Sequence, residues 1–177
     1  MQSQDKNAPH IYRIAFDGMM LALSMVLSYI ETLIPFYFGA PGIKPGFANM
    51  VLLFYFKQSG RRKWDGILVT LLRILLTGFL FGNAFSILYS MSGAVLSILW
   101  LYLICNHTFL RRLYLPVMSA VSGIFHNLGQ WILAFLVFNG VGLWYYFPVL
   151  MLFGAVAGIL TGTIYYLLQP YLQRMMR

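Results

Sequence analysis

Charged residues are scarce in this chain of 177 residues, because they make up only 9% of it. An ordinary soluble domain carries about 25%. Hydrophobic residues make up 60% of the chain and its mean hydropathy is +0.77. A soluble protein of this composition could not cover its surface with polar groups. The composition therefore predicts a protein that crosses a membrane several times, and it excludes a cytosolic enzyme, a nucleic-acid-binding module and a secreted disulfide domain.

Residues that build disulfides and metal sites are also few. The single cysteine, Cys105, has no partner for an internal disulfide, and the three histidines lie far apart in the sequence. We therefore expect no metal site and no cofactor. The polar N-terminal segment has no signal-peptide pattern, so the first hydrophobic run should remain attached as a membrane helix.

Six hydrophobic runs predict the fold class. A helix needs about 20 residues to cross the hydrocarbon core. Five of the runs are near this length and the second is shorter; they cover residues 14–34, 46–56, 64–81, 85–105, 115–138 and 145–168. We expect an all-α membrane protein, a bundle of six transmembrane helices in a single domain, 1–177, with a short polar cytoplasmic segment, 1–13, before the first helix.

Basic residues support the count of six spans. With six spans, those outside the helices fall on one side of the membrane except for Lys44; they are Lys6, Arg13, Lys57, Arg61, Arg62, Lys63, Arg111, Arg112, Arg174 and Arg177. Positive residues mark the cytoplasmic side. Both termini are therefore expected in the cytoplasm, and the basic loops should contact anionic lipid headgroups.

Polar residues inside the spans are spaced so that they share helix faces. The predicted faces are Asp17, Ser24, Ser28 and Glu31; Thr70, Arg73 and Thr77; Ser86, Ser90, Gly93 and Ser97; and Ser119, Ser122, His126 and Gln130. A charge inside the bilayer is costly, so these faces should point toward protein or a cavity. We expect Glu31, Arg73, His126 and Gln130 to line a binding site, with Asn127 bonding either ligand or helix backbone. The alternative is a buried ion pair of Arg73 with Glu31 or Asp17, with the Ser and Thr side chains only joining helices.

The segment 35–46 is rich in proline and glycine and cannot form a continuous helix. The run after it covers roughly 18 Å, short of the roughly 30 Å core. This outer loop would bring Lys44 close to the start of the short second helix near Asn49. Helix N-termini attract anions, so we expect Lys44 and Asn49 to bind an anionic group. The alternative is that Lys44 pairs with Glu31 or reaches water.

Three segments resemble a known bacterial membrane family. They read IETLIP at 30–35 followed by PGIKPGFAN at 41–49, SGA at 92–94, and HNLGQ at 126–130. They resemble the family called Gx transporter, also labelled heptaprenyl diphosphate synthase component I. The resemblance covers nearly the whole chain and implies a bacterial inner-membrane protein. Pro45 departs from the pattern, which has an apolar residue there, and stiffens the loop further.

That family is similar to the substrate-binding subunits (S components) of energy-coupling factor transporters. Those subunits are six-helix proteins that bind vitamins from outside and pair with a membrane coupling subunit and two ATPases. The likeness implies that Gly18 and Ala22 meet the coupling subunit. It also implies uptake of a small vitamin-like, flavin, or isoprenoid- or quinone-related ligand through an outward-facing cavity.

The synthase label gives a second hypothesis. Prenyl diphosphate synthases hold magnesium and diphosphate with paired aspartate-rich motifs, but the four acids of this chain, Asp5, Asp17, Glu31 and Asp65, are isolated from one another. The phosphate-binding pattern GxxxxGK[ST] is absent as well. We therefore expect no enzyme, and the alternative role is a non-catalytic membrane partner of a prenyl diphosphate synthase or of quinone or extracellular redox metabolism. A bundle with no ligand is a third hypothesis.

Overall fold

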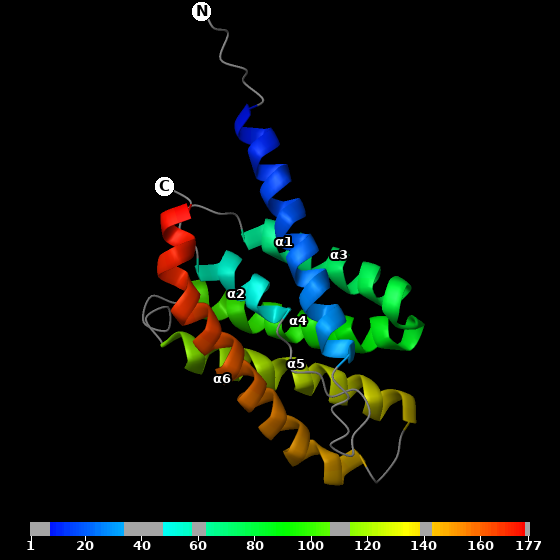
Figure 1. Cartoon of the computed structure of the whole chain (residues 1–177). Coiled ribbons are helices and arrows are strands. Elements are labelled where there is room, and N and C mark those ends of the chain that lie inside the picture. The colour runs from blue at the N-terminus through cyan, green and yellow to red at the C-terminus, as the bar shows by residue number, and fades with distance from the viewer. Residues whose placement is uncertain (1–7, 34–47, 58–62, 107–113, 139–142, 176–177) are drawn as a thin grey trace, which may run out of the picture.

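The computed structural model describes residues 8–33, 48–57, 63–106, 114–138 and 143–175. These residues form six helices and no strand (Figure 1). The helices are α1 (Ala8–Leu33), α2 (Asn49–Lys57), α3 (Lys63–Phe81), α4 (Ala84–Asn106), α5 (Leu115–Phe138) and α6 (Leu143–Met175). The all-helical fold expected from the hydrophobic runs is confirmed.

Five of the six helices are long and apolar enough to cross a membrane. Their apolar stretches are Ile11–Leu33, Lys63–Phe81, Ala84–Asn106, Leu115–Val137 and Trp144–Tyr171. The exception is α2, whose nine residues span only about 14 Å at 1.5 Å per residue. The two largest differences from the sequence-based spans are that α1 begins at Ala8 and that α6 extends to Met175, with Pro148 and Pro170 inside it.

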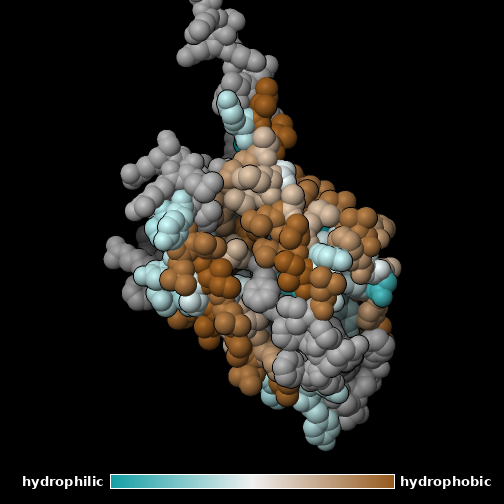
Figure 2. Space-filling model, in the orientation of Figure 1, coloured by the Kyte–Doolittle hydropathy of each residue, from teal (hydrophilic) through white to brown (hydrophobic). Residues whose placement is uncertain are grey.

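The outer faces of the helices are apolar, as a hydrocarbon environment requires. On α3, Leu68, Leu72 and Leu76 are exposed, whereas Thr70 and Arg73 on the opposite face are buried. Figure 2 shows hydrophobic side chains over much of the described surface on one face of the molecule. This arrangement reverses that of a soluble bundle, because the solvent for these faces is lipid.

Helix α2 is enclosed by the other helices (Figure 1). Every residue from Val51 to Phe56 is buried, so no face of this helix is left for solvent or lipid. A helix that is hydrophobic on all sides needs either protein or lipid around it, and here the surroundings are protein. It packs against α1, α3, α4 and α6, and Tyr55 and Leu52 are among the most deeply buried large side chains. Asn49, the first residue of α2, reaches the edge of the polar hollow described below.

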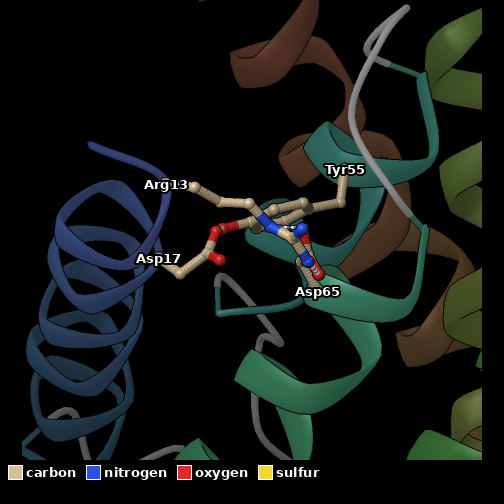
Figure 3. Close-up of polar contacts among 4 residues, drawn as sticks. All are labelled: Arg13, Asp17, Tyr55 and Asp65. Atoms are coloured by element: carbon tan, nitrogen blue, oxygen red, sulfur yellow. Dashed lines mark hydrogen bonds and ion pairs between the residues drawn. The ribbon is translucent and has the colours of Figure 1, made fainter. Parts of the chain in front are cut away.

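Two polar contacts tie the start of α1 to α2 and α3 (Figure 3). The Arg13 guanidinium binds the Asp65 carboxylate with both Nε and Nη2, and the Nε–Oδ2 distance is 2.9 Å. The Tyr55 hydroxyl donates to Asp17. The first turn of α1 and the last turns of α6 lie toward this end of the molecule (Figure 1). We call it the basic end, because Arg13, Lys57 and Lys63 lie there.

The Tyr55–Asp17 contact predicts a coupling energy. We expect Tyr55→Phe to lower the free energy of unfolding by about 1–2 kcal/mol, because a hydrogen bond to a charged group is worth about 1.5–3 kcal/mol. In an Asp17→Ala background the same change should cost almost nothing. Unfolding of the purified protein in detergent measures both values. Equal costs in the two backgrounds would show that the contact contributes no stability.

Candidate functional site

Polar side chains from five helices converge on one hollow inside the bundle. Its volume is about 610 Å³, including its open mouth. Among the residues that line it, the polar ones are Ser28, Glu31 and Thr32 of α1, Asn49 of α2, Arg73 and Thr77 of α3, Ser86 and Ser90 of α4, and His126 and Gln130 of α5. The sequence-based expectation that the polar faces of α1, α3, α4 and α5 point inward agrees with this placement.

Arg73 is the central cation of this hollow. It is the eleventh of the nineteen residues of α3 and is 8% exposed. Its Nη1 donates to Ser28 Oγ at 3.0 Å, and its Nη2 approaches Asn49 Oδ1 at 3.5 Å. Its Nε has no hydrogen-bond partner among the residues that the structure describes. A guanidinium has five N–H donors in a fixed fork, so Arg73 holds donor capacity beyond these two contacts.

Glu31 lies where α2 begins. Its Oε1 accepts the backbone N–H of Ala48 at 3.1 Å, one residue before Asn49 opens the helix. A carboxylate at this point satisfies a free N–H group and complements the positive end of the helix dipole. The side chain is 5% exposed. A ligand's anionic group was expected near this terminus, whereas the described backbone donor there bonds the chain's own carboxylate.

Glu31, and not Asp17, is the acid near Arg73. The Glu31 carboxylate is close enough to interact electrostatically with the guanidinium. Asp17 accepts the Tyr55 hydroxyl instead, and it precedes Ser28, which Arg73 contacts, by 11 residues (28 − 17) or about 16 Å of helix. Of the two ion pairs weighed from the sequence, the one with Asp17 is wrong.

His126 and Gln130 form a pair on α5. Their Nε2 atoms lie 3.1 Å apart, one helical turn from each other along the face predicted from the sequence. His126 also packs against the backbone of Gly93 on α4. A Cβ on Gly93 would lie 2.8 Å from the His126 Nδ1 and the same distance from its carbonyl oxygen. Gly93 therefore makes the room in which the imidazole lies, a role that the sequence did not reveal.

A second, smaller hollow adjoins the first. Its volume is about 400 Å³, including the open space at its mouth, and it lies between α2, α5 and α6. Asn49 and His126 line both hollows, so these two side chains stand at the junction. Ser119, Ser122 and Thr161 contribute hydroxyl groups, and the Ser119 and Thr161 oxygens are 3.1 Å apart. Thr161 was not expected at the site, because its place depends on how α6 packs on α5.

Asn127 bonds helix backbone, one of the two roles considered for it. Its Nδ2 donates to the carbonyl oxygen of Leu150 on α6 at 2.7 Å. It also lines the smaller hollow. Lys44 lies outside the described residues. Gly18 and Ala22 are exposed on the outer surface of α1, away from the hollows, and a Cβ on Gly18 would have nothing within 4 Å.

The fold and the hollows define the class of the molecule: a helical membrane protein with an internal polar site. In the ranges that the structure describes, no three His, Cys, Asp or Glu side chains are grouped so that they could hold a metal ion. The chain matches the family model for heptaprenyl diphosphate synthase component I over residues 20–168, and it belongs to this family. No curated protein and no solved structure matches it.

The match confirms the family resemblance stated from the three sequence segments. It includes the seven candidate ligand-binding residues: Glu31, Lys44, Asn49, Arg73, His126, Asn127 and Gln130. The description of the family names one component of a synthase.

Proposed function

We propose that the protein is an integral-membrane subunit that binds a small molecule in the polar hollow and takes it up from outside, like the S component of an energy-coupling factor transporter. The observation that carries the proposal is the convergence of ten polar side chains around Arg73, whose buried Nε is left without a partner in the described residues. Its ligand is vitamin-like, a flavin, or a molecule related to isoprenoids or quinones.

The position of Arg73 favours binding over helix packing. An arginine near the centre of a membrane helix costs about 2.5–3.5 kcal/mol on insertion scales. A purely structural arginine would recover this cost by satisfying its donors within the protein. Arg73 instead makes one good hydrogen bond, to Ser28, and one long one, to Asn49. An incoming acceptor can therefore gain hydrogen bonds from the guanidinium without breaking an existing network.

The direction of the opening supports uptake from outside. Phe81 and Gly82, which line the hollow, are exposed at the turn between α3 and α4. This turn is at the other end of α3 from Asp65, which binds Arg13 at the basic end. Because basic residues mark the cytoplasmic side, the mouth would face outward. Both termini would lie on the cytoplasmic side of the bacterial inner membrane.

Transport would require other subunits. The exposed small residues Gly18 and Ala22 on α1 allow another helix to approach closely. Their proposed partner is a membrane coupling subunit that works with two ATPases.

A second function is favoured by the family description, which names a component of heptaprenyl diphosphate synthase. In that role the protein would be a non-catalytic membrane partner of a prenyl diphosphate synthase, or of quinone or extracellular redox metabolism. Affinity purification of the intact protein from gently solubilised membranes separates the two. A coupling subunit with ATPases supports transport, and a soluble prenyltransferase supports the partner role.

Native mass spectrometry tests whether the hollow binds a ligand. We expect the purified protein to carry a reproducible small molecule that is not a phospholipid. His126→Ala should lose it, because His126 lines both hollows, whereas Leu88→Ala, a change of an exposed apolar residue on α4, should keep it. A protein that carries only phospholipid in all three forms would contradict the proposed function.

A further inference from the structure

One edge of the Arg73 guanidinium is poorly used by the protein. A guanidinium presents parallel N–H groups along the edge formed by Nε and Nη2, and this edge matches the two oxygens of a carboxylate. In Arg73 the Nε has no partner among the described residues, and Nη2 approaches Asn49 Oδ1 at 3.5 Å, longer than an ordinary hydrogen bond. The good contact, to Ser28 Oγ at 3.0 Å, uses Nη1. Arg73 can therefore still donate two hydrogen bonds to one planar acceptor.

Arg13 shows how the same edge is used when a carboxylate occupies it. Its Nε donates to Asp65 Oδ2 at 2.9 Å and its Nη2 donates to Asp65 Oδ1, so one carboxylate takes both N–H groups (Figure 3). The Arg13 side chain is partly exposed, whereas Arg73 is buried. A charged hydrogen bond is stronger where water does not compete with it. The buried arginine is thus the one whose Nε–Nη2 edge would gain more from a carboxylate.

The acid near Arg73 bonds elsewhere. Glu31 is close enough to attract the guanidinium electrostatically, but its Oε1 accepts the Ala48 N–H at 3.1 Å. The hydrogen-bond partners that the structure describes for Arg73 are the neutral oxygens of Ser28 and Asn49. Glu31 therefore lowers the cost of burying the cation, while the Nε–Nη2 edge remains for another acceptor.

This edge belongs to the wall of the larger hollow. Arg73, Ser28 and Asn49 all line that hollow, and Asn49 also lines the smaller one. A carboxylate that enters here would replace the long contact between Nη2 and Asn49 with two short, charge-assisted bonds. The bond from Nη1 to Ser28 could stay in place and hold the guanidinium during the exchange.

We infer that the ligand of the larger hollow carries a carboxylate, whose two oxygens accept hydrogen bonds from Nε and Nη2 of Arg73. The inference rests on the proposed function and names its substrate class, a small carboxylic acid. Arg73 then selects the ligand by the shape of its donor pair as well as by its charge. Lysine offers a compact charge without this planar pair and cannot replace it.

A matched pair of fluorinated probes tests this inference on the intact protein. Para-fluorobenzoate and para-fluorobenzamide have nearly the same shape, but only the benzoate offers two equivalent acceptor oxygens. Dissociation constants are measured by fluorine NMR titration into the protein in lipid nanodiscs, and empty nanodiscs correct for partition into lipid. We expect wild type to bind the benzoate about tenfold or more tightly than the benzamide, because hydrogen bonds between charged groups are stronger than neutral ones.

Arg73→Lys separates the donor pair from the charge. We expect this variant to prefer the benzoate by about threefold or less, because it keeps the charge and loses the fork. Arg13→Lys makes the same change at the basic end, where Asp65 occupies the fork, and it should keep the full preference of wild type. Thermal unfolding in the nanodiscs shows that both variants are folded.

Para-fluorophenyl phosphate distinguishes a carboxylate from a phosphate, the other oxyanion that a guanidinium binds with two hydrogen bonds. We expect it to bind wild type more weakly than the benzoate, because the guanidinium fork is planar, as a carboxylate is and a phosphate is not.

Four probe results would overturn the inference: equal affinities for benzoate and benzamide, no binding of either, tighter binding of the phosphate, or the full benzoate preference in folded Arg73→Lys. The ligand itself gives a separate reading. The small molecule found by native mass spectrometry, once released, should form a methyl ester in acidic methanol, as carboxylic acids do. A bound molecule without a carboxyl group overturns the inference and leaves the proposed function intact. Absence of any bound small molecule contradicts the proposed function, even where the probes bind as expected.

Discussion

Gly123→Ala is expected to destabilise the protein by about 2–3 kcal/mol, or to prevent its accumulation in the membrane. Helices α5 and α6 approach each other at glycines, and a Cβ on Gly123 would lie 2.2 Å from the carbonyl oxygen of Gly154. Both atoms at this contact belong to rigid backbone, so the helices themselves must separate. Overpacking of this kind costs about 1–3 kcal/mol. Separation would also break the 2.7 Å bond from Asn127 to Leu150 and widen the smaller hollow.

The matched control is Gly18→Ala. Gly18 also lies inside a helix, but a Cβ there meets nothing within 4 Å. We expect its thermal unfolding temperature in detergent to equal that of wild type or to rise slightly, because alanine has the higher helix propensity. Equal unfolding temperatures for Gly123→Ala and wild type would show that α5 and α6 do not pack as closely as described.

Arg73→Gln is expected to reduce ligand binding about 100-fold, which corresponds to about 2.7 kcal/mol. Glutamine keeps a polar group at the site but removes the charge and most of the donors. Hydrogen bonds from a charged donor are worth about 1.5–3 kcal/mol each, so the loss of one or two to the ligand accounts for this factor. The measurement is the molar amount of small molecule that remains with the purified protein.

Arg13→Gln is the control for this prediction. It makes the same chemical change on another transmembrane helix, where Arg13 binds Asp65 at the basic end (Figure 3). The Arg13 side chain is 40% exposed, and exposed ion pairs contribute little to stability. We expect this variant to unfold near the wild-type temperature and to keep its ligand. Loss of ligand in both variants would mean that arginine removal acts through folding and not through the hollow.

Helical spacing was sufficient to predict the inward faces. Ser24, Ser28 and Glu31 follow intervals of four and three residues, and all three are buried on one side of α1. The burial of α2 was not predicted from the sequence, because an apolar helix can be surrounded by lipid as well as by protein. The inward faces depend on one helix at a time, which is why the sequence contained them.

Features that depend on two helices could not be read in this way. The contact between the Glu31 carboxylate and the Ala48 N–H requires knowing where α2 begins and which face of α1 lies beside it. The space that Gly93 leaves for His126 depends on the register between α4 and α5. Thr161 reaches the smaller hollow only because α6 packs closely on α5. Each of these is set by tertiary packing, which no single helical period encodes.

Cysteine accessibility tests the central claim, that the polar faces enclose a water-accessible hollow open to the outside, most directly. The background is Cys105→Ala, which removes the single native thiol. Ser90→Cys lines the hollow on α4, and Leu88→Cys, two residues earlier, is 54% exposed on the apolar surface. A charged, membrane-impermeant methanethiosulfonate is added to intact cells, and labelling is followed by mass spectrometry. The account predicts rapid modification at position 90 and almost none at position 88, because a thiolate forms in water and not in lipid; modification at position 88 alone, or at position 90 only after the cells are opened, would contradict it.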